Sequence, residues 1–196
     1  YTGVINIVSY PENINYIKLK GFYGSYDYKN YILSANVKLN NSLHFLNYSN
    51  KSSDGYIENT DFDIHNYFHH SVFYIMNSKI DFQTGFQNKK FGANGFYSPK
   101  YKEQYEEGKV YYSSLKLTTG NKIKFISSVY WRRKTDHYIL IRSNPEIYQN
   151  FHLTDTYGSQ LNLSFDNFLG KSSIGVNFRN ESLLSNRLGY DLPKPI

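Results

Sequence analysis

Apolar and polar side chains alternate along most of the chain with a period of two residues. The clearest run lies at 31–39, where Tyr31, Leu33 and Val37 are separated by residues such as Ser34 and Asn36. Successive side chains of a β-strand point to opposite faces, so this pattern predicts a half-buried strand. Comparable runs occur near 80–87, 109–117, 123–131, 157–165 and 174–179. The chain therefore predicts an all-β fold of about nine strands, each roughly seven to twelve residues long.

The expected connections between these strands alternate in length. Short turns are expected at 40–42, 77–78, 118–122 and 167–171, and long polar connections at 50–61, 88–108 and 134–155. The connection at 88–108 is longer than a compact soluble domain usually carries without a functional reason.

Outer-membrane barrels have short turns on one side and long loops on the other, which is the pattern expected here. The sequence therefore favours an antiparallel transmembrane β-barrel of meandering strands; a part of such a barrel taken alone would be an open, curved sheet. The alternatives are a soluble, aromatic-rich β-sandwich that binds carbohydrate or a partner surface, and a repeat array.

Aromatic residues are abundant, with 21 Tyr and 14 Phe against one Trp and one Met. Tyrosine suits a surface between an apolar medium and water, because its ring is apolar and its hydroxyl is polar. A biased base composition of the gene is the competing explanation. The mean hydropathy of −0.59 argues against an apolar run long enough for a transmembrane helix.

The net charge of +6 comes from Lys and Arg residues that are mostly scattered singly. This distribution predicts a solvated basic surface and no nucleic-acid partner. The absence of cysteine excludes disulfides and thiolate metal sites. Because the chain begins at Tyr1 within a β-prone segment, we expect it to be an internal fragment.

Several stretches resemble one known family. Residues 3–8 read GVINIV, and the segments 53–64, 91–106 and 128–140 read SDGYIENTDFDI, FGANGFYSPKYKEQYE and SVYWRRKTDHYIL, followed by HLTDTYG at 152–158. Together they resemble the TonB-dependent outer-membrane receptors of Gram-negative bacteria, and they are similar to the cobalamin-transporter branch.

The resemblance implies a 22-stranded barrel closed by a plug domain, with residues 1–11 ending the plug and residues 12–196 forming the first part of the barrel. It also implies active import of a scarce ligand, a cobalamin-like cofactor or an iron chelate, across the outer membrane. The implied partners are the TonB complex, acting through a plug segment outside this chain, the ligand, and outer-membrane lipid or lipopolysaccharide.

Four acidic residues surround Asn59 in the expected loop at 50–61 and just beyond it. Grouped carboxylates suit Ca²⁺, and cobalamin transporters use loop carboxylates in this general region, so a Ca²⁺ site is the candidate here. An acidic, solvated loop is the competing interpretation, and no cofactor is expected to be required. The candidate ligands are Asp54, Glu58, Asp61 and Asp63.

Two further groups are candidate ligand-binding residues. Asn94, Phe96 and Tyr97 could contact a ligand or could pack their own loop. Arg132 and Arg133 could hold an anionic ligand group or the phosphates of lipopolysaccharide, and charges at a membrane rim are the competing interpretation.

The aromatic residues Tyr130, Trp131 and Tyr138 are expected in the outer girdle of the barrel. His65 and His69 are spaced to share a face of a strand, a weak indication of a transition-metal site. No nucleophile elbow, zinc-protease motif or phosphate loop occurs, so we expect the chain not to be an enzyme.

Overall fold

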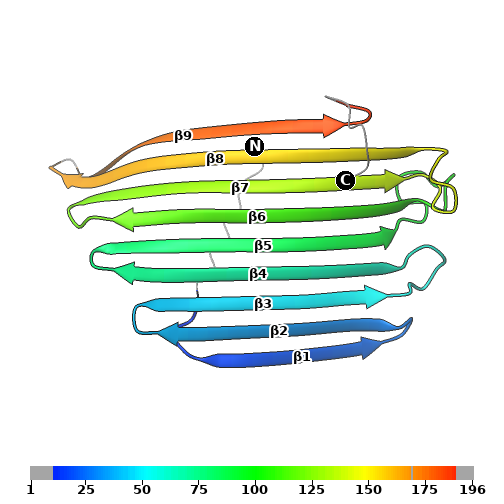
Figure 1. Ribbon diagram of the computed structural model, residues 1–196, viewed down its shortest axis with the longest axis horizontal. Coiled ribbons are helices and arrows are strands. Elements are labelled where there is room, and N and C mark those ends of the chain that lie inside the picture. Colours follow the sequence, from blue (N-terminus) through cyan, green and yellow to red (C-terminus); the bar gives the residue numbers. More distant parts are fainter. Residues whose placement is uncertain (1–10, 169, 189–196) are drawn as a thin grey trace.

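Nine antiparallel strands form a single open sheet in the computed structural model, which describes residues 11–168 and 170–188 (Figure 1). The all-β prediction and the strand number are confirmed. The described residues include no helix that is long and apolar enough to cross a membrane. The strands are β1 (Tyr16–Gly24), β2 (Tyr28–Leu39), β3 (Ser42–Ser53), β4 (Phe62–Ile75), β5 (Ser78–Gly92), β6 (Tyr105–Thr119), β7 (Ile123–Ile139), β8 (Gln149–Asn167) and β9 (Gly170–Ser185).

Each strand pairs with the strands that precede and follow it in the sequence. The order across the sheet is therefore the order along the chain, with β1 and β9 at the two edges. Contacts between strands occur only between such neighbours, so no second sheet packs on either face within the described ranges. The expected plug end at 1–10 lies outside the described residues.

The pairing register brings the predicted apolar positions of all nine strands onto one side of the sheet, which we call the apolar face. Leu33 lies opposite Tyr48, and Leu161 lies opposite both Ser127 and Val176. Many of its large apolar side chains are exposed to a third or more of their full area: Ile17, Leu19, Leu33, Val37, Leu46, Leu115, Val129, Leu161, Leu163, Ile174, Val176 and Phe178. This side of the sheet therefore bears rows of exposed apolar side chains, with no protein layer over them in the described residues.

The opposite side, the polar face, carries amides and hydroxyls over the same rows. Several of them form hydrogen bonds across strands, such as Asn47 Nδ2 to Ser34 Oγ at 2.8 Å and Gln87 Nε2 to Asn66 Oδ1 at 2.7 Å. The two faces thus differ in polarity, as an alternating sequence requires. This difference specifies the register, since a shift of one residue would move every apolar side chain to the other face.

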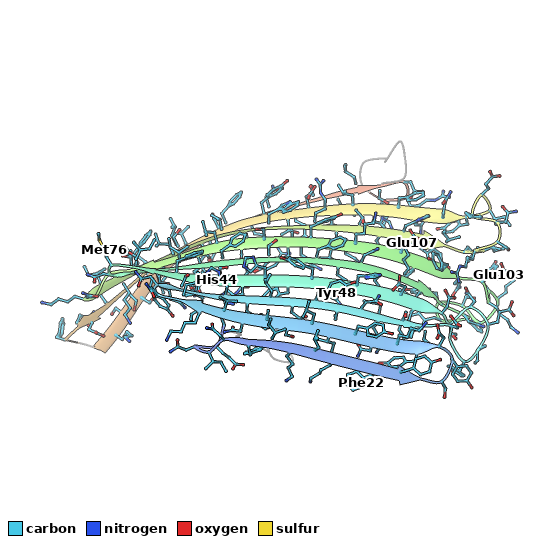
Figure 2. All side chains as sticks on the ribbon, turned by 60° about the horizontal axis from the view of Figure 1, so that its bottom comes forward. Phe22, His44, Tyr48, Met76, Glu103 and Glu107 are labelled. Atoms are coloured by element: carbon cyan, nitrogen blue, oxygen red, sulfur yellow. The ribbon has the colours of Figure 1, made fainter. Side chains whose placement is uncertain are left out.

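Successive connections lie alternately at the two ends of the sheet (Figure 1). At the short-turn end the connections are 40–41, 76–77, 120–122 and the turn between β8 and β9, and at the long-loop end they are 25–27, 54–61, 93–104 and 140–148. Figure 2 labels Met76 at the first of these ends and Glu103 at the other. The predicted alternation of short and long connections is confirmed from β2 onward, whereas 25–27 is as short as 120–122.

All three predicted long connections are shorter in the structure than we expected. The connection predicted at 50–61 occupies only 54–61, the one predicted at 88–108 only 93–104, and the one predicted at 134–155 only 140–148. Their flanking residues continue the strands instead. These extensions lie beyond the apolar rows, where both faces carry polar residues, so the strand there has no period-two signal.

An aromatic row borders the apolar face on its long-loop side. Tyr48, Tyr67, Phe86 and Tyr111 are direct register neighbours on four successive strands, β3 to β6. Trp131 on β7 and Tyr157 on β8 lie opposite each other on the same face, one row nearer the short-turn end, since Tyr111 itself pairs with Arg133. On β8 the apolar side of the strand extends over the nine positions 157–165, about the length of a strand that crosses a bilayer.

The expected girdle of Tyr130, Trp131 and Tyr138 is only partly correct. Tyr130 and Tyr138 differ from Trp131 by an odd number of positions, so they lie on the polar face, where Tyr130 covers Gly158. The misassignment follows from grouping aromatic residues by closeness in the sequence when their faces alternate.

The segment before β1 is held against the polar face by Asn36. The side chain of Asn36 is almost completely buried, accepts a hydrogen bond from the Glu12 backbone N–H at 3.0 Å, and donates to the Glu12 and Ile14 carbonyls. The chain therefore reaches β1 from the polar side of the sheet.

Candidate ligand site at the long-loop end

Three long connections meet at the long-loop end, and Arg142 joins them. Its guanidinium donates to both carboxylate oxygens of Asp61, at 2.6 and 3.0 Å, and to Asn59 Oδ1 at 3.2 Å. It also lies 4.1 Å from the centre of the Tyr105 ring. A planar guanidinium suits this combination of a bidentate carboxylate and a stacked ring. Arg142, in the loop 140–148, thus holds Asp61, in the loop 54–61, beside Tyr105 at the start of β6.

Asn59 provides the second link between these loops. It adopts a positive φ of 56° and donates through Nδ2 to the Lys102 and Gln104 carbonyls, at 2.9 and 2.7 Å. Gly92 lies so close beneath it that a Cβ at that position would be 2.5 Å from the Asn59 backbone. Glycine at 92 is therefore required for the two loops to approach each other.

Tyr105 lies under the Arg142 guanidinium and is buried. Burial raises the pKa of Tyr105 to about 12, and the Glu107 carboxylate, which accepts its hydroxyl at 3.2 Å, acts in the same direction. The phenol is therefore neutral at physiological pH and presents an intact ring to the cation. The loops 54–61, 93–104 and 140–148 consequently form one hydrogen-bonded unit, which we call the loop cluster.

An aromatic ledge projects from the loop cluster. Phe96 and Tyr97 are 77% and 54% exposed, and their rings meet edge to face with centres 4.9 Å apart. Tyr97 also meets the ring of Tyr138, at 5.4 Å, on the polar face of β7. The ledge (Phe96, Tyr97 and Tyr138) offers ring faces to any molecule that approaches the long-loop end from the polar side.

Gln104 supports the ledge from below. It is 1% exposed, and its Oε1 accepts the Tyr97 backbone N–H at 3.1 Å, whereas its Nε2 lacks a hydrogen-bond partner in the structure. A buried amide N–H without a partner costs stability.

The sequence-predicted loop residues take different roles. Phe96 and Tyr97 form the ledge, whereas Asn94 holds the loops together, because it donates to the Glu58 carbonyl at 2.7 Å and its N–H donates to the Asn59 carbonyl at 3.1 Å. Their use in ligand binding stays a prediction.

The four acidic residues near Asn59 have different surroundings. Asp61 pairs with Arg142, and Asp63 accepts hydrogen bonds from Asn50 at 2.8 Å and His65 at 3.1 Å. Asp54 is exposed and lines a hollow of about 320 Å³ together with Asp61 and Asp63, whereas Glu58 lines another. The described residues contain no cluster of three or more His, Asp or Glu side chains that could hold a metal ion. The Ca²⁺ site stays a prediction.

Arg132 and Arg133 lie on opposite faces, so they do not form one binding site. Arg133 lies on the apolar face, where its Nε and Nη2 donate to Asp155 at 2.9 and 2.7 Å. Asp155 also accepts from the Trp131 ring N–H at 3.2 Å. Arg132 is exposed on the polar face.

His65 and His69 share the apolar face as expected, but each has its own partners. His65 contacts Tyr48 Oη at 3.0 Å, and His69 Nε2 lies 2.7 Å from Ser71 Oγ. Ser71 Oγ also lies 2.7 Å from Nδ1 of His44, a residue that the sequence did not single out.

The residues that organise the long-loop end are mostly ones that sequence reasoning missed. Arg142, Gln104 and Asp155 belong to no motif, and all three fall within the predicted connections 88–108 and 134–155. A single Arg that bridges two loops leaves no pattern in the sequence. The contact between Gly92 and Asn59 indicates a tight approach of the loops only once the structure is known.

No protein-family model matches the chain, and a search of curated proteins found no match.

Proposed function

We propose that this chain belongs to an outer-membrane TonB-dependent receptor that actively imports a cobalamin-like cofactor or an iron chelate. In this proposal the apolar face contacts lipid, and the polar face lines the interior, where the plug would lie. The long-loop end lies outside the cell and the short-turn end faces the periplasm.

One observation carries the proposal: the described residues form a single sheet, one face of which bears rows of exposed apolar side chains bordered by an aromatic row. In water such a face would be expected to be covered, since exposed apolar patches of this extent occur at interaction or membrane surfaces. Lipid accounts for the apolar rows and for the amphipathic Tyr and Trp side chains at their border. Within the described ranges β1 and β9 each pair on one side only, and a sheet in lipid requires partners for its edge groups.

The loop cluster and ledge support the uptake role. A preorganised set of loops with exposed rings on the polar side suits capture of a large, partly apolar ligand at the mouth of a barrel. Asn36 supports the placement of the plug, because it holds the segment 12–14 against the polar face.

The first test is the location and folding of the protein made from its own gene. We expect it in the outer-membrane fraction, as a band whose gel mobility shifts after boiling, because closed barrels resist detergent until heated. A soluble protein in the periplasm or medium would overturn the proposal and direct attention to glycan binding.

The ledge is tested on the protein once it is located in the membrane. Phe96→Ala and Tyr97→Ala are expected to weaken binding of cobalamin or of a ferric chelate about tenfold each, because each removes a ring face of the kind worth roughly 1 kcal/mol or more. Phe168→Ala at the short-turn end, where the side chain is also exposed, is the control. If the three variants weakened ligand binding equally, the ledge would not be part of the binding site.

A further inference from the structure

A groove lies on the apolar face between β6 and β7, directly on the long-loop side of the aromatic row. It has a volume of about 280 Å³ and is lined by Lys109, Tyr111, Trp131, Arg133 and Thr135. The register makes Lys109 a neighbour of Thr135, and Tyr111 a neighbour of Arg133. We call it the β6–β7 groove.

The polar groups of the β6–β7 groove are arranged to receive an anion. Arg133 uses Nε and Nη2 for Asp155, which fixes the plane of the guanidinium, and its Nη1 forms no hydrogen bond with a described residue. Lys109 forms no ion pair with another described residue, and Thr135 brings a hydroxyl beside it. Asp155 neutralises one of the two cations, so Lys109 provides the net positive charge.

The other end of the groove continues into apolar surface. Below Tyr111 and Trp131 lie Leu115 and Val129, which are register partners and are both exposed. A ligand that fills this surface therefore needs an anionic head and hydrocarbon chains, with the head at the aromatic border.

We propose that the β6–β7 groove binds a lipid with a phosphate head group, its phosphate between Lys109, Arg133 and Thr135 and its acyl chains on Leu115 and Val129. This inference rests on the proposed membrane location. It differs from the uptake site, because the groove lies on the face opposite the ledge. A phosphate suits Lys as a point charge and Arg as a planar donor.

The fluorescence of Trp131 gives a direct test, because it is the only Trp in the chain and it lines the groove. Folded, heat-modifiable protein in a neutral maltoside detergent is titrated with phosphatidic acid, with diacylglycerol of the same acyl chains, and with inorganic phosphate. We expect a saturable change with phosphatidic acid alone.

Lys109→Ala is expected to weaken the response to phosphatidic acid about tenfold, the effect of losing one charged contact to the phosphate. Lys134→Ala, one residue from Arg133 but on the polar face, is the matched control and should leave it unchanged. If Lys109→Ala does not fold, Lys109→Gln keeps the length of the side chain and replaces it.

Three results would overturn the inference: equal responses to phosphatidic acid and diacylglycerol, an equal response to inorganic phosphate, or equal effects of Lys109→Ala and Lys134→Ala. Heat-modifiability and membrane location are measured beforehand on the same protein. Their failure would refute the proposed function, whereas a barrel without phosphate preference would refute only the lipid site.

Discussion

Neighbouring residues at the long-loop end of β6 have opposite electrostatic roles because they lie on opposite faces. Glu107 accepts the Tyr105 hydroxyl and lies 3.5 Å from Lys90 on the same face as the aromatic row. Glu106 lies on the polar face, where burial raises its pKa and the charge of Asp136 raises it further, against the smaller effects of Lys89 and Lys134. An ionised Glu106 therefore costs stability.

We predict that Glu106→Gln stabilises the folded protein at pH 7. Because the folded pKa is above the unfolded value, the stability that protonated Glu106 provides is complete below the unfolded pKa and is lost as pH rises through the folded pKa. The urea midpoint, followed by Trp131 fluorescence, should rise by roughly 0.3 M at pH 7 and not at pH 4.

Glu107→Gln is the matched control, since it removes the same charge one residue away but also weakens the contact with Lys90. It should leave the midpoint at pH 7 unchanged or lower it. A gain from Glu107→Gln equal to that from Glu106→Gln would mean that net charge, and not the burial of Glu106, sets the effect.

At the scale of elements, the packing of the long loops against each other depends on how closely the end of β5 approaches the loop at 54–61. Gly92 ends β5, and a Cβ there would meet backbone atoms of Asn59, which cannot rotate away as a side chain can. Gly108, near the start of β6, has its nearest such atom at 3.6 Å, an ordinary contact.

Gly92→Ala should therefore separate the loops, at a cost of about 1–3 kcal/mol, typical of overpacking. Trypsin should then cleave rapidly after Lys100 and Lys102, which lie in the loop at 93–104. The Gly108→Ala variant should be cleaved by trypsin at the same rate as the unaltered protein. Identical digestion of the two variants would show that the loop cluster does not depend on the close approach at Gly92.

The strands themselves were predictable where one face is apolar and the other polar. The runs containing Leu33, Leu161 and Val176 located β2, β8 and β9, because the period of two is a direct consequence of the pleat. The lengths of β8 and β9, 19 and 16 residues, exceed the seven to twelve that we expected. Beyond the aromatic row the same strands continue with polar residues on both faces. Hydrogen bonds to the neighbouring strands hold these extensions in the sheet, and such bonds leave no pattern in a single sequence.

The loop cluster was predictable only in location. A long loop between β5 and β6 was expected, and Phe96 and Tyr97 were singled out within it. The contacts of Arg142 with Asp61 and Tyr105 join residues about 80 and about 40 positions apart, so they depend on which loops the sheet brings together. Local patterns contain no information on such pairs.

At the scale of the whole molecule, the two faces of the sheet should respond differently to the same charge. Leu161 lies midway along the apolar positions of β8 and is 47% exposed, and its neighbour Gln160 lies on the polar face. In lipid, Leu161→Arg should destabilise the fold by about 2–4 kcal/mol, the cost of Arg at the middle of a bilayer on a barrel surface.

Gln160→Arg should cost less than about 1 kcal/mol, because the polar face admits a solvated side chain. The folded fraction of each variant in phospholipid vesicles, read from gel mobility without boiling, measures the difference. Equal losses would mean that the apolar face does not contact lipid.

The strict succession of strands also bears on how such a sheet forms and how it can change in length. Because each strand contacts only its predecessor and successor, every pairing spans a short stretch of sequence, and the contact order is low for a β protein. Adding a strand therefore requires closing only one small loop. A hairpin such as β8–β9 can be gained by duplication or lost by deletion while the pairing of the remaining strands is preserved, as in repeat proteins stabilised by nearest-neighbour interfaces.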